Sequence, residues 1–237
     1  MPISRFRFFC PHMVEDVATL AGDEARHATR VLRLRPGDAV ELFDGCGMVA
    51  TGTLDHVGRD EVSVRLGARR SEPRAAWQLT VASAVPKGGR LQDMVSQLVQ
   101  VGVDRWVPLA TQRASVHPRE AKLDRLGRVV VEACRQSRRS WLMEIAAMHT
   151  LAEVLAESAE LRVIAMPGDH QVPVPSADLR SAIVLIGPEG GWTDAEVDQV
   201  REAGWRPWSL GPHIMRIETA AVVAAARLRA DAGGEVC

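Results

Sequence analysis

The sequence predicts an α/β protein with a small β-rich domain at residues 1–72 and a larger domain at residues 73–237. Short alternating strands with tight turns fill the first 70 residues, which is typical of a small barrel. From Trp77 onward, apolar strands alternate with amphipathic helices, the pattern of a parallel sheet flanked by helices. Between them, the turn-forming segment at residues 71–74 marks a linker.

In the first domain, a hairpin is the clearest signal. Residues 39–43 alternate, residues 44–47 (Asp-Gly-Cys-Gly) form a turn, and residues 48–54 continue as the second strand. We also expect strands at residues 6–9 and 61–66 and a helix at residues 23–34.

In the second domain, the spacing of apolar residues alternates between the period of a strand and the period of a helix. We expect strands at residues 79–85, 105–109, 161–166, 182–186 and 208–210, and helices at residues 91–101, 123–138, 193–204 and 217–230. Gly102 and Gly204 are placed to end two of these helices, and Thr193 with Glu196 forms a capping box.

Composition excludes several classes of protein. The chain has 237 residues, 46% hydrophobic, and no apolar run near the roughly 20 residues that span a bilayer. Without a signal-peptide core at the N-terminus, we expect a cytoplasmic protein with no membrane partner. The four cysteines are scattered, so neither a metal site nor a disulfide framework is expected.

Charge is uneven although the net charge is −1. Residues 112–141 hold eight Arg or Lys side chains against three acids. Such a stretch fits either a polyanion-binding surface or a solvated helix face, and the sequence leaves both open.

Two glycine-rich segments carry the functional signal. Residues 186–193 (Ile-Gly-Pro-Glu-Gly-Gly-Trp-Thr) and residues 210–220 (Leu-Gly-Pro-His-Ile-Met-Arg-Ile-Glu-Thr-Ala) each follow an apolar strand and lead into a helix. Ligands dock where strand ends meet helix starts, so we expect one pocket built from both loops. The first loop is neither a P-loop nor a dinucleotide fingerprint, and a plain tight turn is the alternative.

Ionisable groups in these loops are few. Glu189 is the one such group between residues 186 and 193, and the second loop adds His213, Arg216 and Glu218. Glu218 sits where an acid also favours a helix dipole, so it serves equally well as a cap. No triad or carboxylate pair indicates covalent catalysis, which favours a transfer reaction driven by positioning.

Together these segments resemble the RsmE family, bacterial small-subunit rRNA uridine-N3 methyltransferases of the SPOUT class. The resemblance runs nearly end to end. Its most specific parts are residues 186–191 and 210–220, with support from Arg7-Phe8-Phe9, Val31-Leu32-Arg33-Leu34 and Arg113-Ala114-Ser115.

The resemblance implies a PUA-like N-terminal β-barrel that binds RNA and a SPOUT-type α/β trefoil-knot domain that binds S-adenosylmethionine. It implies a homodimer, with 16S rRNA or the small ribosomal subunit as partner and no metal. The implied cofactor-binding residues are Met166, Ile186, Gly187, Glu189, Gly190, Gly191, Leu210, Gly211, Ile214 and Met215. The implied RNA-binding residues are Arg7, Arg33 and Arg139.

For catalysis, Arg216 is expected to stabilise a uracil oxygen or hold a phosphate, and Glu218 to orient Arg216 or act as base. One departure from the family's pattern is His213, where arginine is usual. The alternatives are a SPOUT methyltransferase for another RNA site and an RNA-binding ribosome-assembly factor without turnover.

Overall fold

The structure is a computed structural model that describes residues 6–13, 16–58, 60–114, 125–168, 170 and 179–231. It divides into two compact units, Met1–Arg74 with Cys134–Leu142, and Ala75–Ala133 with Met143–Cys237. The second unit therefore gives a short segment, residues 134–142, to the first, which the linear domain boundary at residue 72 did not anticipate.

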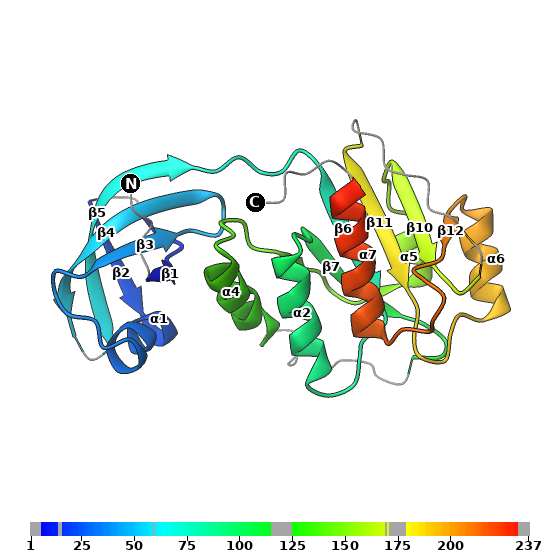
Figure 1. The fold of residues 1–237 in the computed structure, drawn as a ribbon, viewed down its shortest axis with the longest axis horizontal. Coiled ribbons are helices and arrows are strands. Elements are labelled where there is room, and N and C mark those ends of the chain that lie inside the picture. Colours follow the sequence, from blue (N-terminus) through cyan, green and yellow to red (C-terminus); the bar gives the residue numbers. More distant parts are fainter. Residues whose placement is uncertain are drawn as a thin grey trace. The chain divides into compact units, whose positions relative to one another are not determined.

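The N-terminal unit is built on a curled five-stranded sheet with the order β1-β3-β4-β5-β2 (Figure 1). Its strands are β1 (Arg7–Phe9), β2 (Val17–Ala21), β3 (Ala39–Phe43), β4 (Met48–Val57) and β5 (Glu61–Ser71). β1 pairs with β3 in parallel, and all other neighbours are antiparallel. Two register shifts between β4 and β5 add to the curl. The predicted hairpin is confirmed.

The helix predicted at residues 23–34 is shorter than expected. α1 (Gly22–Arg26) passes directly into a π-helical turn, η1 (His27–Val31). The chain then leaves the helix, and Arg33 adopts the left-handed conformation with φ 54°. A left-handed residue cannot continue a right-handed helix, so the predicted end at residue 34 was wrong.

The C-terminal unit holds a parallel sheet with the order β12-β10-β11-β6-β7-β8, and β9 pairs separately with β7. The strands are β6 (Gln78–Ser83), β7 (Arg105–Ala110), β8 (Glu144–Ile145), β9 (His149–Thr150), β10 (Leu161–Ala165), β11 (Ser181–Ile186) and β12 (Arg206–Trp208). The helices are α2 (Arg90–Gln100), α5 (Leu151–Leu155), α6 (Asp194–Glu202) and α7 (Ile217–Asp231). A further helix, α4 (Leu126–Ser137), begins in this unit, and its last four residues belong to the N-terminal unit. The predicted parallel sheet flanked by helices is confirmed.

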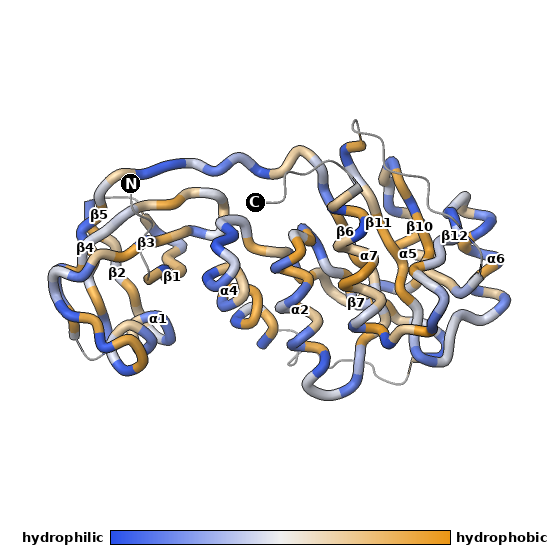
Figure 2. The backbone as a smooth tube through the Cα atoms, in the orientation of Figure 1, coloured by the Kyte–Doolittle hydropathy of each residue, from blue (hydrophilic) through white to orange (hydrophobic). Residues whose placement is uncertain are grey.

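Helices cover both faces of this sheet (Figure 1). α5 and α6 pack on one face through a core that includes Val154, Val200 and Leu185. α7 packs against β6 and β11 on the other, with α2 beside α7. Figure 2 shows that β10 and β11 are strongly apolar, as expected for strands buried on both faces.

The described residues show neither a membrane-spanning helix nor a cluster of metal ligands. No described helix is long and apolar enough to cross a bilayer. In the same part of the chain, no three His, Cys, Asp or Glu side chains gather closely enough to hold a metal ion.

Candidate functional site

Three loops meet at one edge of the parallel sheet. They follow the carboxyl ends of β10, β11 and β12, which are neighbours in the order β12-β10-β11. Ala165 at the end of β10 lies opposite both Ile186 of β11 and Trp208 of β12, so the three strands end level. Carboxyl ends of parallel strands are where α/β proteins bind ligands.

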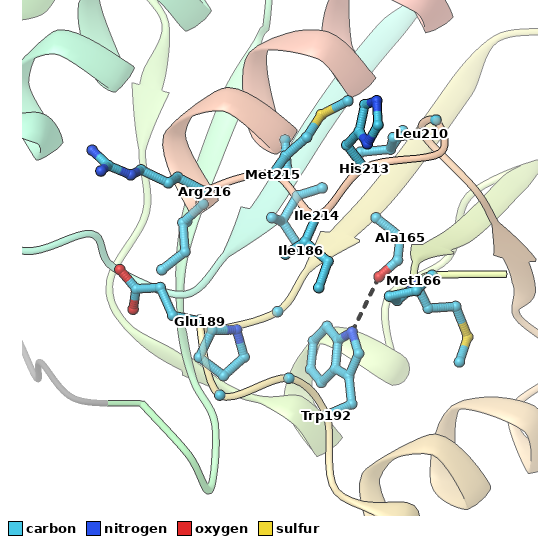
Figure 3. Close-up of a pocket in the computed structure, with 18 of the residues that line it drawn as sticks. Ala165, Met166, Ile186, Glu189, Trp192, Leu210, His213, Ile214, Met215 and Arg216 are labelled. Carbon is cyan, nitrogen blue, oxygen red and sulfur yellow. Dashed lines mark hydrogen bonds between the residues drawn. The ribbon is translucent and has the colours of Figure 1, made fainter.

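A cavity of about 710 Å³ lies between these loops (Figure 3). This volume is in the range of small-molecule sites. All ten residues predicted to bind cofactor line it, and so does Arg216. Of the other lining residues, Trp192, Ile217 and Ala220 lie within the two predicted segments but were given no role, and Ala165 lies outside them.

Trp192 joins the first two loops inside the cavity. Its indole Nε1 donates a 3.2 Å hydrogen bond to the carbonyl oxygen of Ala165. The ring lies so close to Gly187 that a Cβ there would come within 2.8 Å of it. Gly187 must therefore be glycine to accommodate the indole.

The loop at residues 187–192 turns sharply on glycine. The amide of Gly191 donates to the carbonyl of Pro188 at 2.9 Å, and Gly191 has φ +71°, a left-handed conformation that favours glycine. At Gly190, a Cβ would lie 3.2 Å from the Cβ of Arg113. Gly190 thus makes room for a neighbouring segment of the chain.

Charged groups gather at the cavity rim. Glu189 and Arg216 lie on the same side of the cavity, and the Arg216 side chain points away from the cavity centre (Figure 3). Arg90, at the start of α2, places Nη1 3.5 Å from the Glu218 carboxylate and 4.0 Å from that of Glu189. Sequence reasoning missed Arg90, because nothing local marks it as part of this site.

Glu218 does not line the cavity. Its Oε1 pairs with Arg90 rather than with Arg216, and its buried Oε2 has no hydrogen-bond partner. The expectation that Glu218 orients Arg216 therefore finds no support in the described contacts.

Ile214 is unusual for an apolar residue, since it is 91% exposed while lining the cavity. His213 beside it is also exposed. Both stand in the third loop, where a bound molecule would cover them.

Comparison with known proteins identifies this arrangement. An RNA methyltransferase domain model matches residues 73–229. The chain is 32% identical to the ribosomal RNA small subunit methyltransferase E of Synechocystis, covering 92% of this chain and 74% of that protein. The chain belongs to the ribosomal RNA small subunit methyltransferase E family. A relative from Mycobacterium tuberculosis is 31% identical over 88% of this chain and 84% of its own length.

Two solved methyltransferase structures have the same fold. A putative methyltransferase from Legionella pneumophila, solved with bound SAM, superposes with a TM-score of 0.88 at 27% identity, covering 96% and 98% of the two chains. The small subunit methyltransferase E of Neisseria gonorrhoeae, bound to S-adenosyl methionine, gives 0.86 at 25% identity, covering 94% and 96%.

The N-terminal unit of the methyltransferase also matches. An RNA methyltransferase PUA domain model covers residues 20–67, which confirms the predicted PUA-like domain. Of the arginines predicted to bind RNA there, Arg33 is exposed. Arg139, on the segment that joins this unit from the C-terminal side, is half-buried.

Arg7, the third arginine predicted to bind RNA, is buried in this structure. It is only 4% exposed, with Nε 3.2 Å from the Glu41 carboxylate and Nη2 donating to Ser140 at 2.6 Å. Its guanidinium also lies 4.5 Å from the ring centre of Phe43. Burial lowers the pKa of Arg7, and the Glu41 carboxylate opposes that shift. Arg7 therefore binds the segment at residues 134–142 to the sheet and is not available to a phosphate.

Proposed function

We propose that this protein is an S-adenosylmethionine-dependent methyltransferase acting on N3 of a uridine in the 16S rRNA of the small ribosomal subunit. The observation that carries the proposal is the cavity formed where three strands end level. It lies in a chain of this methyltransferase family whose solved relatives bind the same cofactor.

The residues present fit that cofactor. Glycine backbone at residues 187, 190, 191 and 211 lets a ligand approach N–H and C=O groups closely. Apolar side chains of Leu210, Met215 and Ile186 suit an adenine ring. The cofactor, once bound, supplies a methyl group activated on a sulfonium centre.

The rim groups act on the uridine. N3 must lose its proton before it can attack, and negative charge then spreads to the uracil oxygens. Arg216 donates to one of these oxygens or to a neighbouring phosphate, since a guanidinium offers a rigid fork of donors. Glu189 accepts the N3 proton, because its carboxylate lines the cavity on the side of Arg216 whereas Glu218 does not. Arg90 lies between the two carboxylates.

The PUA-like unit binds the RNA. Arg30 in η1 and Arg33 and Arg35 on the segment between η1 and β3 are all exposed, and their charges match a phosphate backbone. Arg139 supports this surface, and Arg7 contributes through structure alone. A homodimer in the cytoplasm completes the proposal, with exposed Ile214 as a residue that a second copy or the substrate covers.

Methyl transfer to RNA tests the function. Purified protein is incubated with S-adenosylmethionine labelled in its methyl group and with small subunits, naked 16S rRNA or tRNA from a strain lacking the enzyme. Incorporation into small subunits or 16S rRNA supports the proposal. Cofactor binding without incorporation into any RNA would favour the assembly factor instead.

In the same assay Glu189→Gln should lose more turnover than Glu218→Gln, and the reverse order would return the role of base to Glu218. Light scattering of the purified protein tests the homodimer, which a monomer mass would exclude.

A further inference from the structure

Arg113 binds the second cavity loop, residues 187–192 after β11, although Arg113 itself does not line the cavity. It follows β7, and its Nη1 donates to the carbonyl oxygens of Gly190 at 3.0 Å and Trp192 at 3.2 Å. Gly190 and Trp192 lie 77 and 79 positions after Arg113 in sequence, so these contacts exist only in the folded chain. Both carbonyl groups belong to the loop that lines the cavity.

The same two peptide groups are also fixed through their amides. The Gly191 amide, in the peptide that carries the Gly190 carbonyl, donates to Pro188. The Thr193 amide, in the peptide that carries the Trp192 carbonyl, donates to Glu196 Oε2 at 2.8 Å. With Arg113 bound to their carbonyl oxygens, both peptide groups are hydrogen-bonded at the carbonyl and at the amide, which fixes their orientation.

A buried carboxylate strengthens this link. Glu196 is 2% exposed, and its Oε1 accepts a 2.9 Å hydrogen bond from the Gln112 amide. Its Oε2 holds the loop through the Thr193 amide. The segment at residues 112–113 is therefore linked to the loop twice, by its backbone through Glu196 and directly by the Arg113 side chain.

Arg227 binds backbone carbonyl groups of the third cavity loop, which follows β12, as Arg113 does in the second. It extends from α7, and its Nη1 lies 3.4 Å from the carbonyl oxygen of Ser209 and 3.3 Å from that of Leu210. Its guanidinium also lies 5.0 Å from the ring centre of Trp208, at the end of β12. Two arginines from different elements thus each bind a pair of carbonyl groups on a cavity loop.

We infer that Arg113 and Arg227 are positioning residues for the cofactor, which hold the two glycine-containing loops in their binding conformation. A site built from backbone groups binds tightly only if its peptide planes are ordered before the ligand arrives, since ordering them on binding reduces affinity. Charged donors are the stronger class of hydrogen-bond partner for such carbonyls. The identity of the ligand rests on the proposed function, whereas the clamping of the loops does not.

Calorimetry on full-length variants tests the binding effect. Arg113→Ala and Arg227→Ala should each weaken S-adenosylmethionine affinity about 10-fold, the scale of one charge-assisted hydrogen bond. The double variant should lose about 100-fold, because separate loops give additive effects. Turnover at saturating cofactor should stay within about twofold, and Arg113→Lys should recover most of the affinity. Arg201→Ala is the matched control, since the Arg201 side chain is 74% exposed and its described ion pair is with Asp198 on the same helix.

Amide hydrogen exchange of the ligand-free protein tests the clamp without any cofactor. Gly191 and Thr193 amides should exchange about 10-fold faster or more in Arg113→Ala and stay as in wild type in Arg201→Ala. Unchanged exchange together with unchanged cofactor affinity would overturn the inference. A lower salt dependence of rRNA binding in these variants, with normal cofactor affinity, would instead show that the two arginines contact phosphates. A change in the molecular mass of the particle would show that they lie in a subunit interface. If wild-type protein binds no S-adenosylmethionine yet shows the exchange effect, the proposed function fails and the clamp stands.

Discussion

Arg216→Ala separates a catalytic from a structural role for the rim arginine. Arg216 is exposed, and no hydrogen bond or ion pair of its side chain appears among the described contacts. Its backbone carbonyl accepts the Ala220 amide at 2.8 Å, and alanine keeps that bond. Removing the side chain should therefore change the free energy of unfolding by no more than about 0.5 kcal/mol.

The effect on turnover should be far larger. Loss of one preorganised donor typically reduces turnover by about 10² to 10³-fold, or about 2.7 to 4 kcal/mol. Arg216→Lys should recover only part of this loss, because an ammonium cannot reproduce the planar fork.

Three measurements on one preparation decide the matter: steady-state methylation of small subunits, calorimetric cofactor affinity and thermal unfolding. If Arg216 acts in the transition state, turnover should fall about 100-fold while cofactor affinity and the unfolding temperature stay nearly unchanged. Turnover within about threefold of wild type, which is less than 1 kcal/mol, would show that Arg216 does not act in the transition state. A parallel fall in all three would assign it to structure.

Three further changes probe the rest of the molecule. Trp192→Phe keeps the ring against Gly187 but loses the 3.2 Å bond to Ala165, so calorimetry should show about fivefold weaker cofactor binding, and unchanged affinity would contradict the link between the loops. Arg7→Met removes one of the arginines that pair with Glu41, which keeps Arg70 and Arg138, and it also removes the bond to Ser140. The free energy of unfolding of the N-terminal unit should therefore fall by about 2 kcal/mol in denaturant titrations, with no change in the salt dependence of rRNA binding; a reduced salt slope would restore Arg7 as a phosphate contact. Burial and Arg135 lower the pKa of His27, so the unfolded chain takes up that proton first as pH falls below about 6.5. Stability should therefore drop between pH 7 and pH 5.5, and this drop should be smaller in His27→Gln; an equal drop in both proteins would refute the assignment.

Much of the fold follows from local pattern. The apolar runs that became β10 and β11 and the capping box at Thr193 are signals within a few residues of the chain. β2 was missed although its burial alternates strictly, because small residues weaken its apolar pattern. α5 was missed although Thr150 and Glu153 form a capping box, which is a signal that the sequence does contain.

Some residues of the site follow from local sequence pattern, and others depend on tertiary packing. Glycine spacing identified the loops, because backbone that approaches a ligand closely needs glycine locally. Arg90, Arg113 and Arg227 were not found as site residues, because their partners are set by tertiary packing. Arg7 was assigned to RNA for the same reason: its burial depends on Ser140, 133 residues away. How the chain threads through its own loops also leaves no periodic signal, which is why the knot was expected from resemblance alone.

The identity of the methylated nucleoside tests the central claim most directly. Small subunits from a strain lacking the enzyme are methylated by the purified protein, and their 16S rRNA is digested to nucleosides for mass spectrometry. We expect 3-methyluridine as the new product, absent when cofactor or enzyme is omitted. A ribose 2′-O-methyl nucleoside, a different methylated base, or no new nucleoside from a protein that binds the cofactor would contradict it.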